Sequence, residues 1–287
     1  MDKQIKDSLF DLSGTVTIIT GSTKGMGHDT ARRFVQHGSK VVVSSRNQNE
    51  CDVYAAELNK DAGREAAVGI AADLSDLTSL ERLVDKAVKR FGRLDNLICN
   101  ASAMSFGRED QVTPDEFSAC LVTNIRNNYL LCKRAIPHLK KAGRGSIILV
   151  SSAAAFRADE SMGVYAISKR GLIQLMENMA SYLGQDNIRV NCIIPGFIRT
   201  EASRPLWTNP QSLRAGQMAS PLRRIGEGDD IAGAALFLCA ASGNFTTGHC
   251  LLVEGGILTM GGIGSAVKAD ELLPDHVQSQ IYQSVEK

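Results

Sequence analysis

Short apolar runs alternate with longer amphipathic segments through most of the chain. The runs are rich in Val, Ile and Leu and almost continuously apolar, which is typical of strands buried on both faces of a parallel sheet. We predict such strands at residues 16–20, 41–43, 66–71, 94–100, 146–151, 188–194 and 250–253. Helical spacing predicts helices at about 27–38, 48–62, 77–91, 114–139, 165–184 and 229–241. This alternation predicts an α/β protein with a Rossmann-type, doubly wound parallel sheet of about seven strands and helices on both faces.

No linker divides this pattern, so we expect a single domain over residues 1–262. Within it, residues 197–225 contain prolines and Trp207 without a clear period, and we expect a loop and helix pair over a substrate cleft. The polar residues 263–287 are expected to form a C-terminal extension that packs on a neighbouring subunit. The apolar residues expected in the cleft, each of which would serve equally well as core, are Phe156, Met162, Phe197, Trp207 and Met218.

Charge and cysteine content narrow the class of protein. The 32 basic and 31 acidic side chains nearly cancel, and no basic stripe indicates a nucleic acid or membrane partner. No apolar run approaches the ~20 residues of a membrane span, and the polar N-terminus does not resemble a signal peptide. The seven scattered cysteines lack C-x-x-C pairs, which is typical of buried thiols in a reduced compartment rather than a disulfide framework or metal site. We therefore expect a cytoplasmic protein without a metal ion.

The first predicted strand runs into a glycine-rich turn. Glycines at 21, 25 and 27 allow a tight turn, a close approach to a pyrophosphate and free amides at a helix N-terminus. Because the turn follows a strand and precedes a helix, it has the context of a dinucleotide-binding turn, although an ordinary strand–helix turn would also explain it.

The end of the second strand indicates which dinucleotide would bind. An NAD-type site places Asp or Glu there for the ribose 2′-hydroxyl, but this chain has Ser45 and Arg46. A guanidinium holds phosphate through two hydrogen bonds, and Lys24 would add a second positive charge on the same side. We therefore predict NADP(H) rather than NAD(H). The alternative is that Arg46 is a solvated loop charge.

Two later strand ends supply further polar groups. Asp73 is placed to accept a hydrogen bond from the adenine amino group, with Leu74 contributing its backbone. The alternative role for Asp73 is to cap the following helix. Asn100 and Ala101, at the end of the fourth strand, would lie across the nicotinamide half.

Tyr165 and Lys169 are four residues apart, so they lie on the same face of a helix. There the ammonium would favour the phenolate and lower a pKa that starts at about 10. Ser152 closes a predicted strand and can present its hydroxyl to the same phenol. This group suits proton transfer to or from the oxygen of a carbonyl/alcohol pair, although the Tyr/Lys pair alone would also fit an ordinary amphipathic helix.

Asn124 interrupts an apolar stripe on the predicted helix 114–139. A buried amide without partners is costly, so this side chain either bonds to a neighbouring backbone group or has a functional role.

Taken together, these motifs resemble the short-chain dehydrogenase/reductase family, in its compact, single-domain form. The matching elements are Thr-Gly-x-x-x-Gly-x-Gly at 20–27, Asp73, Asn100-Ala101, Asn124, Ser152, Tyr165-x-x-x-Lys169, and Pro195-Gly196 followed by Thr200. They occur in the family's order and span roughly residues 12–257. The end of the second strand further resembles NADPH-dependent carbonyl reductases and 3-oxoacyl-carrier-protein reductases.

The resemblance implies hydride transfer between NADP(H) and a small carbonyl or alcohol substrate. Tyr165 would donate the proton in reduction, and Ser152 would hold the substrate oxygen. Lys169 would lower the tyrosine pKa and bind the nicotinamide ribose, while Asn124 would carry a water-mediated relay from Lys169 to solvent. The implied cofactor contacts are Gly21, Ser22, Thr23, Lys24, Gly25, Met26, Gly27, Ser45, Arg46, Asp73, Leu74, Asn100, Ala101, Tyr165, Lys169, Pro195, Gly196, Ile198 and Thr200.

The chain also departs from the family pattern. Ser102 replaces a glycine near the nicotinamide, which would trim the substrate pocket. A glycine usual after the catalytic serine is absent from 153–156, and Met26 stands where isoleucine is common.

Three functions fit these residues. We expect an NADPH-dependent reductase of ketones or aldehydes; the alternatives are an alcohol dehydrogenase of hydroxysteroid or sugar type and a catalytically silent NADP(H)-binding sensor. An enoyl reductase is disfavoured, since that subgroup spaces its tyrosine and lysine more widely. The family also implies a homotetramer, or a homodimer, formed through the long helices. The residues that support it are Gly171, Leu175, Met179 and Leu183.

Overall fold

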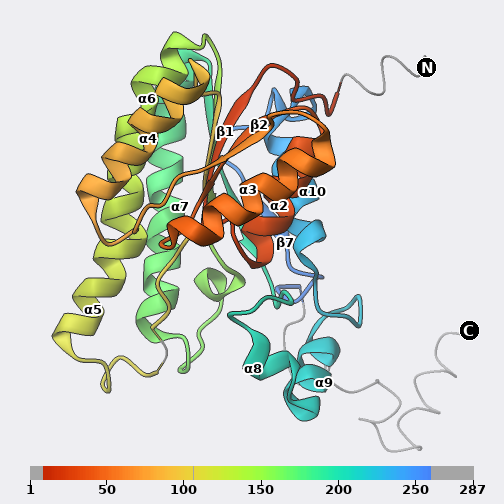
Figure 1. Ribbon diagram of the computed structural model, residues 1–287. Helices are drawn as coiled ribbons and strands as arrows, with labels where there is room; N and C mark the ends of the chain where they lie inside the picture. The colour runs from red at the N-terminus through yellow and green to blue at the C-terminus, as the bar shows by residue number, and fades with distance from the viewer. Residues whose placement is uncertain (1–8, 106, 260–287) are drawn as a thin grey trace, which may run out of the picture.

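Seven parallel strands form one sheet through the middle of the molecule (Figure 1). The computed structural model describes residues 9–105 and 107–259. The strands are β1 (Val16–Thr20), β2 (Lys40–Ser44), β3 (Ala67–Gly69), β4 (Asn96–Cys99), β5 (Gly145–Val150), β6 (Ile188–Pro195) and β7 (Cys250–Val253). Their order, β3-β2-β1-β4-β5-β6-β7, confirms the predicted doubly wound Rossmann-type sheet.

Helices cover both faces of this sheet (Figure 1). One face carries α2 (Gly25–Gln36), α3 (Gln48–Ala62) and α10 (Gly228–Cys239), and the other carries α4 (Leu77–Phe91), α6 (Asn128–Lys141) and α7 (Gly163–Leu183). Neighbouring strand residues point to opposite faces, so Ile18 packs in the core beside α4, α6 and α7, while Ile19 packs beside α2, α3 and α10. The continuously apolar strands therefore supply two cores, as strands of a parallel sheet must.

The predicted helix 114–139 is interrupted. It consists of α5 (Pro114–Leu121), the π-helical turn η1 (Val122–Asn127) and α6. The predicted strand 66–71 is also shorter, because β3 lies at the sheet edge and pairs only with β2. Short 3₁₀ turns follow other elements, at η2 (Ala153–Phe156), η3 (Gly184–Asp186) and η4 (Ala241–Gly243).

The segment 197–225 contains two short helices, as predicted. They are α8 (Arg204–Trp207) and α9 (Pro210–Ala219), and the Asn209 side chain caps α9. The Trp207 indole donates a hydrogen bond to the Thr200 carbonyl at 2.8 Å. This bond ties the helix pair to the chain that leaves β6.

Two of the four residues that we expected at a subunit interface are buried inside the chain. Met179 and Leu183 are buried in the core of their own chain, at 2% and 1% exposure, and Leu175 packs against the same core. A side chain at Gly171 would collide with Ile125 of η1. For Met179 and Leu183 the expectation was wrong, because an apolar stripe at helical spacing marks the buried face of a helix whichever partner covers it.

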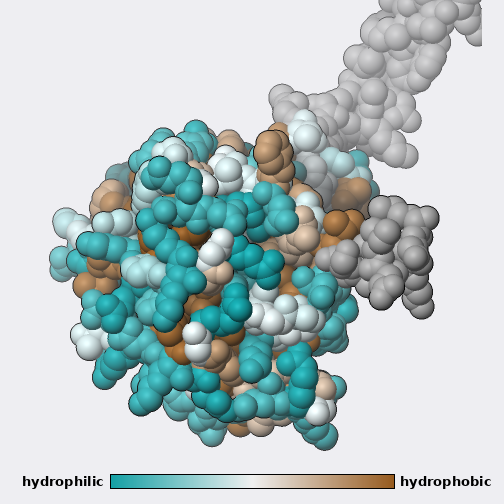
Figure 2. Space-filling model, turned by 90° about the horizontal axis from the view of Figure 1, so that it is seen from above, coloured by the Kyte–Doolittle hydropathy of each residue, from teal (hydrophilic) through white to brown (hydrophobic). Residues whose placement is uncertain are grey.

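The face in Figure 2 is mostly hydrophilic, with hydrophobic side chains in small separate groups. Among the described helices, none combines the length and the apolar character that crossing a membrane requires. The expected C-terminal extension, 263–287, lies outside the described residues.

Candidate active site

A cavity of about 830 Å³ opens where the carboxyl ends of the central strands meet. It lies around the ends of β1 and β4, where the strand order reverses, which is where doubly wound sheets bind ligands. Its volume suits a ligand of cofactor size. The lining includes Thr20, Gly21, Thr23, Lys24, Gly25 and Met26 from the glycine turn; Ser45, Arg46, Asn47 and Glu50 after β2; and Ala72, Asp73, Leu74 and Ser75 after β3. It also includes Asn100, Ala101, Ser102, Ala103 and Met104 after β4, with Tyr165, Lys169 and Thr200.

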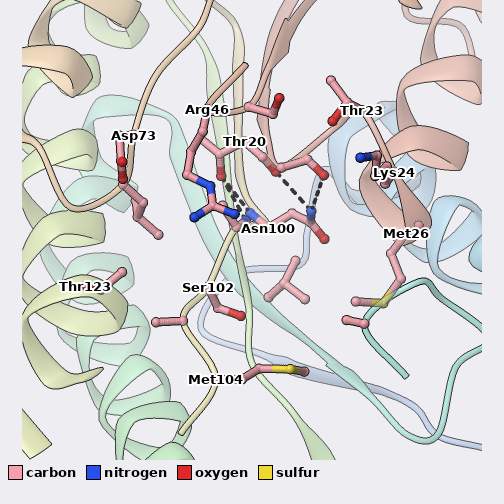
Figure 3. A pocket seen from close by; sticks show the side chains of 18 of the residues that line it. Thr20, Thr23, Lys24, Met26, Arg46, Asp73, Asn100, Ser102, Met104 and Thr123 are labelled. Atoms are coloured by element: carbon pink, nitrogen blue, oxygen red, sulfur yellow. Dashed lines mark hydrogen bonds between the residues drawn. The ribbon is translucent and has the colours of Figure 1, made fainter. Parts of the chain in front are cut away.

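The glycine turn has the close packing that its sequence indicates. Gly21 has a φ of 66°, a left-handed conformation that glycine adopts without strain. A side chain at Gly27 would collide with the Gly21 carbonyl and approach the Asn100 amide within 2.7 Å. Asn100 donates hydrogen bonds to the carbonyls of Thr20 and Gly21, both at 3.0 Å (Figure 3). The end of β4 therefore fixes the shape of the turn after β1.

Positive charge gathers at the end of β2. In Figure 3 the Arg46 side chain reaches from this strand end into the cavity. Arg46 makes no hydrogen bond or ion pair with another described residue, although its charge helps to lower the pKa of Asp73. The guanidinium is therefore available to a ligand. Lys24 lies on the glycine turn and pairs with Glu50 at 2.9 Å.

The segment after β3 is held by the π-helical turn. Asn127 of η1 donates a hydrogen bond to the Leu74 carbonyl at 2.7 Å. The Asp73 carboxylate accepts bonds from the backbone and hydroxyl of Ser75, both at 2.8 Å, and these bonds lower its pKa. Asp76, rather than Asp73, caps α4. The helix-capping role that we weighed for Asp73 therefore belongs to Asp76.

Tyr165 and Lys169 line one wall of the cavity, and Ser152 lies beside Tyr165 just outside the lining. A hydrogen bond joins Ser152 to the phenol of Tyr165. The Lys169 ammonium lies 5.4 Å from the centre of the Tyr165 ring and donates to the Val150 carbonyl at 2.8 Å. Both Tyr165 and Lys169 are buried, at 8% and 2% exposure. This arrangement places a proton donor and a cation beside each other, both largely buried.

The pKa of Tyr165 departs from our expectation. Burial raises it above its ordinary value, and the hydrogen bond from Ser152 opposes that rise. We expected the charge of Lys169 to lower this pKa. The expectation was wrong, because burial has the larger effect and the ammonium bonds to the Val150 carbonyl. Burial also lowers the pKa of Lys169 itself, to about 8.

The buried charge of Lys169 predicts a pH-dependent stability. From about pH 8 to the ordinary pKa of 10.5, the unfolded chain retains the lysine proton while the folded chain loses it. Below pH 8 both states carry the charged lysine, so the full cost of burying the charge destabilises the fold. Between pH 8 and 10.5 the unfolded state binds more protons, so stability rises with pH. We expect cofactor-free Lys169→Met to be more stable than wild type at pH 7 by about 1–3 kcal/mol, with the difference shrinking towards pH 10.

Urea unfolding of both proteins between pH 7 and 10 measures this difference. Replacing the exposed Lys89 by Met is the matched control, which should give no such convergence. A constant difference between Lys169→Met and wild type across this range would contradict the prediction.

Comparisons with known proteins agree with this geometry. A family model described as "Enoyl-(Acyl carrier protein) reductase" matches residues 21–258. The bovine "Dehydrogenase/reductase SDR family member 4" is 38% identical over 249 residues, which cover 86% of this chain and 88% of that protein. The chain belongs to the short-chain dehydrogenase/reductase family.

Two solved dehydrogenase structures are similar to this chain. A gluconate 5-dehydrogenase from Burkholderia cenocepacia, in complex with NADP and tartrate, has a TM-score of 0.84 at 27% identity. The match covers 89% of this chain and all of the other. A 7α-hydroxysteroid dehydrogenase, complexed with NADH and a 7-oxo bile acid, has a TM-score of 0.83 at 33% identity, covering 88% and 96% of the two chains. The family binds nicotinamide dinucleotides, and this chain is an oxidoreductase of that family.

Asn124 is buried in η1 and all its amide atoms are engaged. Its Oδ1 accepts from the Ala103 backbone at 2.8 Å, and its Nδ2 donates to the Ala103 carbonyl and the Ser168 hydroxyl, both at 2.9 Å. The side chain thus fastens the segment after β4 to helix α7. We weighed a bond to a neighbouring backbone group, whereas the backbone partner is 21 residues away in sequence. The water-mediated relay stays a prediction.

Some residues that the family resemblance implied lie outside the cavity lining. They are Ser22, Gly27, Pro195, Gly196 and Ile198, besides Ser152 and Asn124. The Ser22 amide bonds to the Ser44 carbonyl at 3.0 Å, and a cofactor contact of Ser22 stays a prediction. Of the five apolar residues expected in the cleft, none lines this cavity, and Phe197 lines a second one of about 420 Å³.

Our sequence reasoning missed several lining residues. Asn47, Glu50, Met104, Thr123 and Glu201 are among the polar or large ones. A signal existed for Met104, which comes shortly after the end of β4. Glu50 gave no such signal, because its position depends on how α3 begins after Arg46.

The described residues fit a nicotinamide dinucleotide on two observations. The turn after β1 has no room for a side chain at Gly27, and the Arg46 guanidinium, which has no partner among the described residues, projects into the cavity from the end of β2. The tight turn suits a pyrophosphate, and the guanidinium can bind a phosphate group.

Proposed function

We propose that the chain is an NADPH-dependent reductase that converts a ketone or aldehyde into an alcohol. The observation that carries this proposal is the buried Tyr165 phenol, bonded to Ser152 and adjacent to Lys169 at the cavity wall. A phenol whose pKa is raised holds its proton at neutral pH, as a proton donor for carbonyl reduction must.

Each residue of the site has a role in this proposal. Ser152 and Tyr165 hold the substrate oxygen, on which negative charge develops, and preorganised donors there lower the barrier. Tyr165 then supplies the proton. Lys169 binds the nicotinamide ribose and stabilises the tyrosinate that remains. When bound, the reduced nicotinamide supplies the hydride.

Asn124 supports the site through the contacts already described. With its side chain engaged by Ala103 and Ser168, a relay water would have to bind its main-chain carbonyl. We propose that this carbonyl, which also accepts a hydrogen bond from Asn128 at 2.8 Å, holds a water that passes protons from Lys169 to solvent.

The choice of NADP(H) over NAD(H) is supported by Arg46, which has no partner among the described residues and occupies the position where an NAD site holds a carboxylate. The adenine end would rest on Asp73 and Leu74, and the pyrophosphate on the turn from Gly21 to Gly27.

A second candidate is an alcohol dehydrogenase acting in the oxidative direction. It is favoured by the similarity to a hydroxysteroid and a gluconate dehydrogenase. The four-residue spacing of Tyr165 and Lys169 disfavours an enoyl reductase. The seven cysteines are free thiols, which supports a cytoplasmic location. A homotetramer, or a homodimer, is part of the proposal, and sedimentation velocity tests it.

A panel of ketones and aldehydes, including steroid and sugar ketones, tests the activity by NADPH consumption. We expect turnover with NADPH that exceeds turnover with NADH. Faster reaction of the alcohols with NADP⁺ would favour the dehydrogenase. Binding of NADPH without turnover of any substrate would leave the silent sensor as the function.

A further inference from the structure

The positive charges at the proposed 2′-phosphate site are not equally available. Arg46 makes no ion pair with a described residue, whereas Lys24 is paired with Glu50 through Nζ and Oε1 at 2.9 Å. The other carboxylate oxygen of Glu50 accepts a hydrogen bond from the Thr23 hydroxyl at 3.5 Å. All four side chains come from segments that line the same end of the cavity.

The position of Glu50 follows from the start of α3. The Asn47 side chain accepts a hydrogen bond from the Glu50 backbone at 3.3 Å, which caps the helix immediately after Arg46. Glu50 therefore lies on the first turn of α3 and extends across to the glycine turn. A carboxylate thus occupies, beside Lys24, the region where a phosphate at the ribose 2′ position would find its positive charges.

We propose that Glu50 is a specificity-determining residue that weakens the binding of 2′-phosphorylated adenosine by competing for Lys24. This inference rests on the proposed NADP(H) function for its biological role. The competition between the Glu50 carboxylate and a phosphate for Lys24 can be measured whether or not NADP(H) is the cofactor. A phosphate carries about −1.5 to −2 charges at neutral pH. It must therefore either displace the Glu50 carboxylate from Lys24 or bind next to an uncompensated negative charge.

The Lys24–Glu50 pair is accessible enough to open. The two side chains are 63% and 40% exposed, and ion pairs of such exposure contribute little to stability. Removing Glu50 therefore leaves the fold intact and frees Lys24. We expect Glu50→Gln to bind adenosine 2′,5′-bisphosphate about three- to tenfold more tightly, with unchanged affinity for 5′-AMP.

Isothermal titration calorimetry with these two nucleotides, at low and at physiological salt, measures the effect without catalysis. Glu57→Gln, an exposed site on the same helix outside the cavity lining, is the matched control for net charge. Glu50→Asp retains the negative charge, but its shorter side chain reaches less far towards Lys24. This variant therefore distinguishes competition for the lysine from electrostatic repulsion of the phosphate. In a Lys24→Met background, the gain from Glu50→Gln should disappear.

The outcomes also separate this inference from the cofactor assignment. If wild type prefers the bisphosphate to 5′-AMP but Glu50→Gln does not change that preference, Glu50 has no such role and the NADP(H) proposal stands. If wild type shows no preference but Glu50→Gln acquires one, the competition is real and the NADP(H) proposal fails. Weaker bisphosphate binding by Glu50→Gln would mean that the carboxylate positions Lys24 for the phosphate, which is the opposite of our inference.

Discussion

Replacing Tyr165 by Phe is expected to remove most turnover, by about 10²- to 10⁴-fold in kcat/KM, because this is the usual contribution of a positioned general acid. The substitution keeps the buried ring and deletes only the hydroxyl that bonds to Ser152. Binding of NADPH, followed by fluorescence titration, should change less than about twofold, since the hydroxyl contributes to proton transfer rather than to the cofactor cradle.

The control for this prediction is Tyr129→Phe. Tyr129 is 39% exposed on α6, so loss of its hydroxyl should leave both turnover and cofactor affinity unchanged. Substantial turnover by Tyr165→Phe would remove the central argument for the site. A variant that loses NADPH binding together with turnover would show that the hydroxyl holds the cofactor instead.

The second large effect is expected at Arg46. Arg46→Asp replaces an unpaired guanidinium by a carboxylate at the position where NAD-dependent members place one. It should raise the KM for NADPH by about 10²-fold, because loss of a bidentate phosphate contact and gain of a repulsive charge act in the same direction. The KM for NADH should change little or fall, which makes NADH the internal control.

Steady-state kinetics with both cofactors on one substrate measure this ratio. An unchanged ratio of the two KM values would mean that Arg46 is the solvated loop charge that the sequence also allowed. In that case Lys24 alone would remain as a contact for a 2′-phosphate.

The sequence was informative wherever chemistry follows the end of a strand. The glycine turn, Arg46, Asp73 and Asn100 all come directly after short apolar runs, and parallel strands bring their carboxyl ends to one edge. Tyr165 and Lys169 were found for a similar reason, because a spacing of four residues fixes their relative position on a helix.

The predictions that failed depended on packing between elements that are distant in sequence. The direction of the Tyr165 pKa shift is set by burial, which the spacing from Lys169 does not reveal. Met179 and Leu183 showed an apolar stripe that was correct in period but assigned to the wrong partner. The role of Glu50 required the start of α3 and the glycine turn to be placed side by side. None of these follows from local sequence.

The π-helical turn η1 makes the site sensitive to the deletion of a single residue. Its asparagines reach to both sides, with Asn124 on the segment after β4 and Asn127 on the segment after β3. A turn of this kind accommodates one residue more than an α-helical turn. Deleting a residue from it would restore a regular helix and rotate one side of the break by about 100° relative to the other. The two asparagines could then no longer hold both loops at once, so the spacing between them is as much a part of the site as their side chains.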